Sequence, residues 1–156
     1  MMTRLRIIGP VVALLAVLLT AAGCPVTPVP VTPHSHPLNP APEDISEQGQ
    51  LIVDLVNEQR VAAGCDELVV NGSFVAFANN QAKWMDNGGG FVHSRLGAPI
   101  FAENLSQGIV EPEQLIKTWM DSTEHKANIT NCEYTDTGVG ISGEFVVEVF
   151  GNADPD

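Results

Sequence analysis

Three cysteines and four histidines are the side chains of this chain that could do the most chemistry. A thiol can be acylated, can pair into a disulfide or can bind a metal, and a neutral imidazole can ligate zinc or carry a proton. These residues are Cys24, Cys65, Cys132, His34, His36, His93 and His125. No Ser–His–acid or Cys–His set for nucleophilic catalysis is evident in the sequence, since Ser94 adjoins His93 and sequence neighbours seldom face each other productively. The elements around these residues must therefore decide their roles.

The first cysteine follows a segment typical of export. Arg4 and Arg6 precede an apolar run over residues 7–19, and small residues then lead to Cys24. This pattern predicts a secretory signal peptide over residues 1–23, because the run is shorter than the roughly 20 residues that a transmembrane helix needs. The residues before Cys24 resemble a bacterial lipobox, apart from Ala21, where Leu is commoner. We expect Cys24 to become an acylated (palmitate-type) N-terminus on an envelope membrane, with secretion after a nearby cut as the alternative.

Acylation of Cys24 would leave two cysteines in an oxidising compartment. Cys65 and Cys132 both stand in loop-like sequences, and a bond between them would remove roughly 4 kcal/mol of denatured-state entropy in the chain-entropy model. Two buried thiols are the alternative.

Composition separates a spacer from a folded domain. Residues 25–42 hold seven of the eleven prolines and no charge, so residues 24–43 form a semi-rigid linker of up to roughly 56 Å at about 3.1 Å per residue. His34 and His36 lie in it and would make only a weak metal site. The chain has 7 basic and 19 acidic residues, a net charge of −12, which excludes a basic nucleic-acid-binding surface. One domain is expected over residues 44–152, as a monomer, followed by a tail over residues 153–156.

Helices are predicted first along this domain. Asp44 followed by Glu47 is an N-terminal capping pattern, and Gly64 should end that helix. Asn71 or Ser73 can cap a second helix, with a core stripe of Phe74, Phe77, Ala78, Gln81, Ala82 and Met85. Pro112 suits the first turn of a third helix, with Leu115, Ile116, Trp119 and Met120 inward, and Ser122 or Thr123 can cap a short helix that runs to Ile129.

The C-terminal part changes to the period of a β-hairpin. Residues 137–142 and 145–150 flank a turn at Gly143, with Phe145, Val147 and Val149 on one face and Val146, Glu148 and Phe150 on the other. Helices followed by a small antiparallel sheet predict an α+β domain.

Three segments of this domain resemble a bacterial CAP domain. They are Phe91-Val92-His93-Ser94, Ala102-Glu103-Asn104-Leu105 and the run from Trp119 to Ile129 that contains Glu124-His125-Lys126. The CAP superfamily is named for cysteine-rich secretory proteins, antigen five and pathogenesis-related proteins. The resemblance covers residues 50–151 and implies an α-β-α sandwich with a small antiparallel sheet between helices.

The chain departs from the family pattern near the implied site. Ala102 and Glu124 replace the usual glycines, Lys126 replaces the usual Arg, and Glu148 stands where the closing strand normally has Gln. Two additional carboxylates would make the site more negative and favour cations.

The resemblance implies that His93, Glu103 and His125 line a central cleft. They are the candidate catalytic residues and the candidate ligands of a divalent metal, for which zinc is the best match, with Glu124 and Glu148 as candidates for a fourth position. Each also has a plain structural alternative. His93 could simply form a hydrogen bond in a loop, His125 could cap Asp121 or a carbonyl, and Glu103 could tie a loop to a backbone amide. Glu124 could be a solvated charge and Glu148 a sheet-face carboxylate.

Three classes of function follow for such an extracytoplasmic domain. The first is a binding module for a lipid, a cell-wall component or a divalent cation. The second is a metal-assisted hydrolase, such as a peptidase, with Glu103 as base. The third is a structural envelope protein that only packs against partners. The sequence favours the first and leaves enzymatic activity open.

Overall fold

The computed structural model describes residues 43–153 of the 156. The predicted signal peptide, Cys24, His34 and His36, the rest of the linker before Glu43 and the tail after Ala153 lie outside the described residues. The elements follow the order α1 (Glu47–Ala63), β1 (Val69–Val70), α2 (Gly72–Trp84), the π-helical turn η1 (Met85–Gly89), β2 (Ile100–Gln107), α3 (Pro112–Asp121), α4 (Thr123–Ile129), β3 (Asp136–Ser142) and β4 (Phe145–Gly151). None of the helices in this range is long and apolar enough to cross a membrane.

The strands form one sheet in the order β1-β3-β4-β2. β4 pairs antiparallel with both β3 and β2, whereas the two-residue strand β1 pairs parallel with β3. The predicted α+β class and the β3–β4 hairpin are therefore confirmed, and the short parallel pair makes the sheet mixed rather than purely antiparallel.

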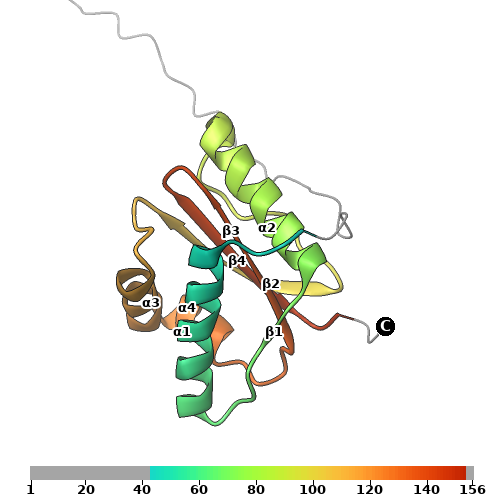
Figure 1. Ribbon diagram of the computed structural model, residues 1–156, viewed down its shortest axis with the longest axis vertical. Coiled ribbons are helices and arrows are strands. Elements are labelled where there is room, and N and C mark those ends of the chain that lie inside the picture. Colours follow the sequence, from blue (N-terminus) through green and yellow to red (C-terminus); the bar gives the residue numbers. More distant parts are fainter. Residues whose placement is uncertain (1–42, 154–156) are drawn as a thin grey trace, which may run out of the picture.

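Helices cover both faces of the sheet, as Figure 1 shows. On one face, α1, α3 and α4 contribute Ile52, Val56, Leu115, Trp119 and Ile129 to a core with Val139, Val146 and Phe150 of the sheet. On the other face, α2 packs Phe74, Phe77, Ala78 and Ala82 against Phe145, Val147 and Val149. The hairpin thus buries side chains on both faces, and the α-β-α sandwich that the resemblance implied is present.

Two glycines of β3 allow α2 to lie directly on the sheet. A Cβ added at Gly138 or Gly140 would collide with backbone atoms of α2 at Phe74 or Ala78. This close approach fixes the position of α2, which in turn supports the loop that carries His93.

Most predicted helix ends are also confirmed. The side chain of Asn71 accepts hydrogen bonds from the N–H groups of Ser73 and Phe74, and Gly64 ends α1 with φ of 87°. The predicted cap of α1 was wrong: α1 starts at Glu47, so Ser46, not Asp44, occupies the capping position, and its hydroxyl accepts from the N–H of Gly49 at 3.0 Å. Met120 is only half buried on α3.

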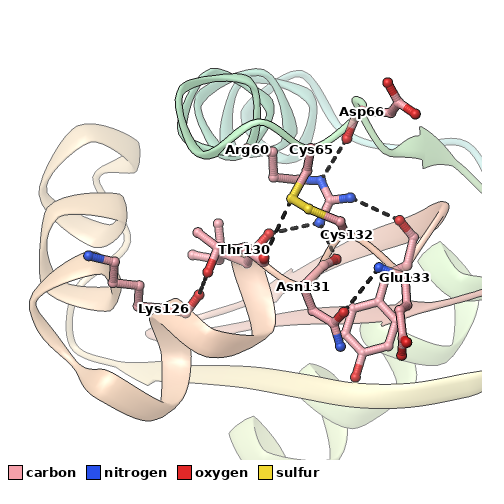
Figure 2. Close-up of a disulfide and its surroundings, with 10 residues drawn as sticks. Arg60, Cys65, Asp66, Lys126, Thr130, Asn131, Cys132 and Glu133 are labelled. Atoms are coloured by element: carbon pink, nitrogen blue, oxygen red, sulfur yellow. Dashed lines mark hydrogen bonds between the residues drawn. A yellow bond between two sulfur atoms is a disulfide. The ribbon is translucent and has the colours of Figure 1, made fainter.

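A disulfide between Cys65 and Cys132, with Cα atoms 4.9 Å apart, closes one end of the domain. Figure 2 shows the guanidinium of Arg60 beside it. Arg60 is fully buried and donates hydrogen bonds of 2.8–3.0 Å to the backbone carbonyls of Asp66, Ile129, Asn131 and Tyr134. The bond and the arginine together join the end of α1 to the segment between α4 and β3.

Candidate functional site

Strand β2 is the element that positions the predicted site. It is an edge strand of the sheet. Two of its backbone carbonyls accept hydrogen bonds from side chains of the neighbouring helices. Asn128 of α4 donates to the carbonyl of Glu103 at 3.4 Å, and Trp119 of α3 donates to the carbonyl of Leu105 at 3.3 Å. Asn104, fully buried, donates to the carbonyl of His125 at 3.2 Å and accepts from Asn128 at 2.8 Å. These bonds fix α4, and with it His125, against the edge of the sheet.

Glu103 is the centre of the site. Its side chain is fully buried, and both carboxylate oxygens accept hydrogen bonds: Oε1 from the backbone N–H of Ser94 at 3.0 Å, and Oε2 from the Ser94 hydroxyl at 2.6 Å. Oε1 also lies 2.8 Å from Nδ1 of His93. The structure therefore brings His93 and Glu103 together and ties both to the loop before β2.

Among residues 43–153, the imidazole of His93 is hydrogen-bonded through Nδ1 alone. Its side chain is 61% exposed, and the hydrogen bond from Nδ1 to Glu103 raises the pKa of His93, while partial burial opposes that rise and the charge of Glu103 adds to it. With Nδ1 donating to the carboxylate, Nε2 is the free nitrogen. It accepts a hydrogen bond when the ring is neutral and donates one when the ring is protonated.

His125 stands at the third position of α4, and its N–H donates to the hydroxyl of the capping residue Ser122 at 3.5 Å. Its ring lies 6.1 Å from that of Trp119, and its Nδ1 is buried with no hydrogen-bond partner among the described residues. Burial lowers the pKa of His125, the neighbouring His93 lowers it further, and Glu124 opposes both. His125 thus lies within electrostatic range of His93, and its surroundings disfavour the protonated ring.

Glu148 is not part of this site. It pairs across the sheet with Asn104, whereas Glu103 pairs with Val149, so the two glutamates face opposite sides of the sheet. Glu148 is fully buried and accepts one bond, from the Thr137 hydroxyl at 3.1 Å, while its Oε2 has no partner among the described residues. Burial raises its pKa to about 8, against the opposing effects of Thr137 and Arg60. Of the two interpretations of Glu148, the sheet-face carboxylate agrees with this placement.

The five candidate residues do not form an ordinary metal centre. Glu124 is solvent-exposed and accepts from Ser122 at 3.3 Å, Glu148 faces away, and the oxygens of Glu103 are already bonded. Within residues 43–153 no three His, Cys, Asp or Glu side chains are grouped so as to hold a metal ion. Two imidazoles, His93 and His125, are the side chains left to a cation.

Sequence reasoning missed the residues that hold the site together. Ser94 attracts attention in the sequence only as a nucleophile, yet it is buried and supplies two of the three hydrogen bonds to Glu103. Asn104 and Asn128 lie inside the matched motifs, where the sequence assigns them no role. None of these three residues belongs to a periodic pattern in the sequence. Their roles are visible only in the hydrogen bonds of the folded domain.

Comparison with known proteins agrees with this fold. The model of the family described as CAP: Cysteine-rich secretory protein family matches residues 53–145. The Bacillus subtilis (strain 168) protein YkwD is 28% identical over 114 residues, which cover 64% of this chain and 44% of YkwD. The chain thus spans less than half the length of that relative.

Three solved bacterial structures have a similar fold. An extracellular protein containing a SCP domain from Bacillus anthracis (21% identity, TM-score 0.60) covers 68% of this chain and is itself covered over 40%. A cysteine-rich secretory protein from Staphylococcus aureus has 20% identity and a TM-score of 0.61, and the match covers 71% of this chain and 40% of that protein. An outer surface protein from Borrelia burgdorferi has 17% identity and a TM-score of 0.61, and the match covers 73% of this chain and 98% of that protein. At these identities the likeness shows the fold, and these neighbours are extracellular or surface proteins.

Proposed function

We propose, since this chain belongs to the Cysteine-rich secretory protein family (CAP), that its domain is an extracytoplasmic binding module that holds a component of the cell envelope at His93. The observation that carries the proposal is the bonding of Glu103, which holds His93 through Nδ1 while the His93 side chain stays 61% exposed. A rigid, half-exposed imidazole with one free nitrogen is suited to hydrogen-bond a ligand.

The same bonds argue against a serine hydrolase. In a catalytic triad the imidazole lies between the serine and the acid, so that it can take the serine proton. Here the carboxylate of Glu103 lies between Ser94 and His93, and the buried Ser94 hydroxyl donates to it. Ser94 therefore acts as a positioning residue.

A divalent cation is the second ligand class that the site could hold. A carboxylate that orients a histidine through Nδ1 is the usual outer partner of a zinc-bound imidazole, and Glu103 and His93 have this arrangement. With His93 and His125 as ligands, zinc would have fewer protein ligands than the three or four of ordinary sites. We expect weak stabilisation by zinc at neutral pH, lost in His125→Ala and lost as pH falls through the histidine titration range. A melting temperature that zinc does not change would rule out a divalent cation as the ligand.

Anchoring through Cys24 is proposed from the sequence. Acylated Cys24 followed by residues 25–42 would tether the domain at a distance from the membrane. Replacing Cys24 by Ser in the full chain should move the protein from the membrane fraction to the soluble fraction. An intact mass that matches an unacylated chain beginning elsewhere would overturn the anchor and leave the binding module unaffected.

The binding proposal is tested by co-sedimentation of the purified domain with peptidoglycan sacculi and, separately, with phosphatidylglycerol vesicles. We expect retention on one of these probes, reduced about tenfold by His93→Ala and unchanged by Glu58→Ala, which alters an exposed residue of α1 on the other face of the sheet. Release of soluble fragments that needs His93 would instead support the hydrolase. Retention on neither probe, or equal retention of both variants, would overturn the proposal.

A further inference from the structure

The outer side of α1 carries apolar side chains in contact with solvent. Leu51 is 42% exposed and Val61 is 57% exposed, and Leu55 is half buried. Two of the five large apolar residues that the described part of the chain exposes therefore belong to this one helix. Such residues need an explanation where they border a shaped surface, and α1 borders two pockets.

The first pocket, here called the apolar pocket, lies between α1 and α3, which cover the same face of the sheet (Figure 1). It has a volume of about 330 Å³, and its apolar wall consists of Leu55, Ile116 and Met120. Gln48 of α1 donates to the carbonyl of Val110 at 2.7 Å, which holds the segment before α3 against α1. The apolar pocket is suited to receive an apolar side chain.

The second pocket, here called the acidic pocket, lies between α1 and the loop before β1. It has a volume of about 460 Å³, and its lining includes Asp54, Asn57, Val61 and Glu67. The carboxamide of Asn57 accepts from the N–H of Leu68 at 2.8 Å and donates to the carbonyl of Leu68 at 3.1 Å. These two bonds fix the neighbouring Glu67 beside α1.

One helix forms a wall of both pockets. Successive residues of an α-helix are about 100° apart around its axis, so Leu55 faces the apolar pocket and Asp54 the acidic pocket. The exposed Leu51, one turn before both residues, lies on the ridge between them. A partner that enters both pockets must therefore cross α1, whose diameter with side chains is about 10–12 Å.

The charge on this side of α1 is negative. Asp54, Glu67 and Glu113 line the pockets and take part in neither of the ion pairs found among the described residues. Among the described residues that line them, the only cation is Lys117, which already pairs with Asp121 at 2.7 Å. The surface therefore leaves negative charge for a partner to neutralise.

We propose that this side of α1 docks a basic amphipathic helix of another protein. The helix places an apolar side chain in the apolar pocket and a lysine or arginine in the acidic pocket. Apolar and basic side chains lie on adjacent parts of such a helix, so it can reach both pockets across the ridge at Leu51. The proposal goes beyond the site at His93 and does not depend on it.

Other occupants match this surface less well. A second copy of the chain would bring a net charge of −12 to an acidic surface. The proline-rich residues 25–42 carry no charge, so they offer no cation to Asp54 or Glu67. An acyl chain would fill the apolar pocket alone, and an anionic headgroup would be repelled at the acidic pocket.

Two matched peptides test the proposal by calorimetry on the full chain carrying Cys24→Ser. Both have leucines at helical spacing, and one carries lysines where the other carries glutamates. We expect the lysine peptide to bind about tenfold more tightly than the glutamate peptide. Asp54→Asn and Glu67→Gln should each weaken the lysine peptide several-fold. Met120→Gln, which makes the apolar pocket polar at a similar side-chain size, should do the same.

Glu144→Gln and Phe101→Ser are the matched controls. They remove an exposed acid from the turn between β3 and β4 and an exposed apolar ring from β2, both outside the two pockets. Neither should change the affinity for the lysine peptide, and His93→Ala should not change it either.

Equal binding of the two peptides would overturn the proposal, because the attraction would then be apolar alone. A loss of affinity in Glu144→Gln as large as that in Asp54→Asn would also overturn it, because the attraction would then belong to the whole acidic surface. Full affinity in Met120→Gln would exclude the apolar pocket. Self-association that Met120→Gln abolishes, with no peptide binding, would identify a second copy as the occupant instead. The proposed function at His93 would survive each of these results, since sedimentation with sacculi or vesicles tests it separately.

Discussion

Glu103 and Glu148 lie on adjacent strands of one sheet, yet their side chains face opposite sides of it. Glu103 meets a serine, a backbone amide and an exposed imidazole, so its charge is well solvated by hydrogen bonds. Glu148 lies in the core with a single bond from Thr137, while the nearby Arg60 directs its donors to backbone carbonyls. The first acid organises a surface site, and the second is a neutral group of the core at neutral pH.

Glu148→Gln should make stability less dependent on pH. The pKa of Glu148 is raised from an ordinary 4.5 to about 8, so between these values the folded state holds a proton that the unfolded state releases. Stability of the wild type therefore falls as pH rises from about 4.5 to about 8, on the order of 1.4 kcal/mol per pH unit for this group. Gln keeps the shape without the charge. Urea unfolding at pH 5 and pH 8 should show the variant more stable than wild type at pH 8 and close to it at pH 5.

The exposed Glu58→Gln serves as the control for this experiment, because its side chain is solvated in both states. A Glu148→Gln variant that is less stable than wild type at pH 8 would mean that the ionised carboxylate is favourable in the core, and the description of Glu148 as a neutral group would be wrong.

Glu103→Gln should lower the pKa of His93. The hydrogen bond to Glu103 and the charge of Glu103 both raise that pKa, whereas burial, which lowers it, is unchanged by the substitution. NMR titration of the His93 ring protons measures the change directly. Since a raised histidine pKa stabilises the fold below the unfolded value near 6.5 and loses that effect as pH rises through the folded value, the variant should also lose stability selectively at acidic pH. An unchanged His93 titration would show that the pair is not formed in solution.

Much of this fold could be predicted because its signals are local. Asn71 and Gly64 match the chemistry of helix ends, and the alternation in β4 correctly placed Val147 and Val149 opposite Val146 and Phe150. Strand β2 was not predicted, because it buries Glu103 and Asn104 and so lacks an apolar pattern. Strand β1 is only two residues long, too short for any period to be detected.

The candidate site could be predicted only in part, because the motifs do not specify how β2 and β4 pair. Family resemblance led to His93 and Glu103, which the structure joins by a hydrogen bond. It also admitted Glu148, because the motif positions alone do not say which strand partner each residue has. The pairing of Glu148 with Asn104 and of Glu103 with Val149 separates the two acids, and no property of either residue alone encodes that pairing.

Loss of the Cys65–Cys132 bond should destabilise the domain by roughly 2–5 kcal/mol, as for other native disulfides that close long loops. Arg60 bonds carbonyls on both sides of the bridge, so its contacts should loosen with it. The double variant Cys65→Ala, Cys132→Ala and the wild type in reducing buffer should show the same lowered urea midpoint. A midpoint equal to that of the oxidised wild type would mean that Arg60 alone holds this end of the domain.

The role of His93 as the ligand-contacting group is tested most directly by the nitrogen resonances of its ring. In the free protein at neutral pH, ring-selective ¹H–¹⁵N spectra should show Nδ1 protonated toward Glu103 and Nε2 as the second, solvent-facing nitrogen. Addition of solubilised peptidoglycan fragments should shift Nε2 of His93 more than any nitrogen of His125. Saturating binding with both His93 nitrogens unmoved would contradict the account, because the ligand would then lie elsewhere on the domain.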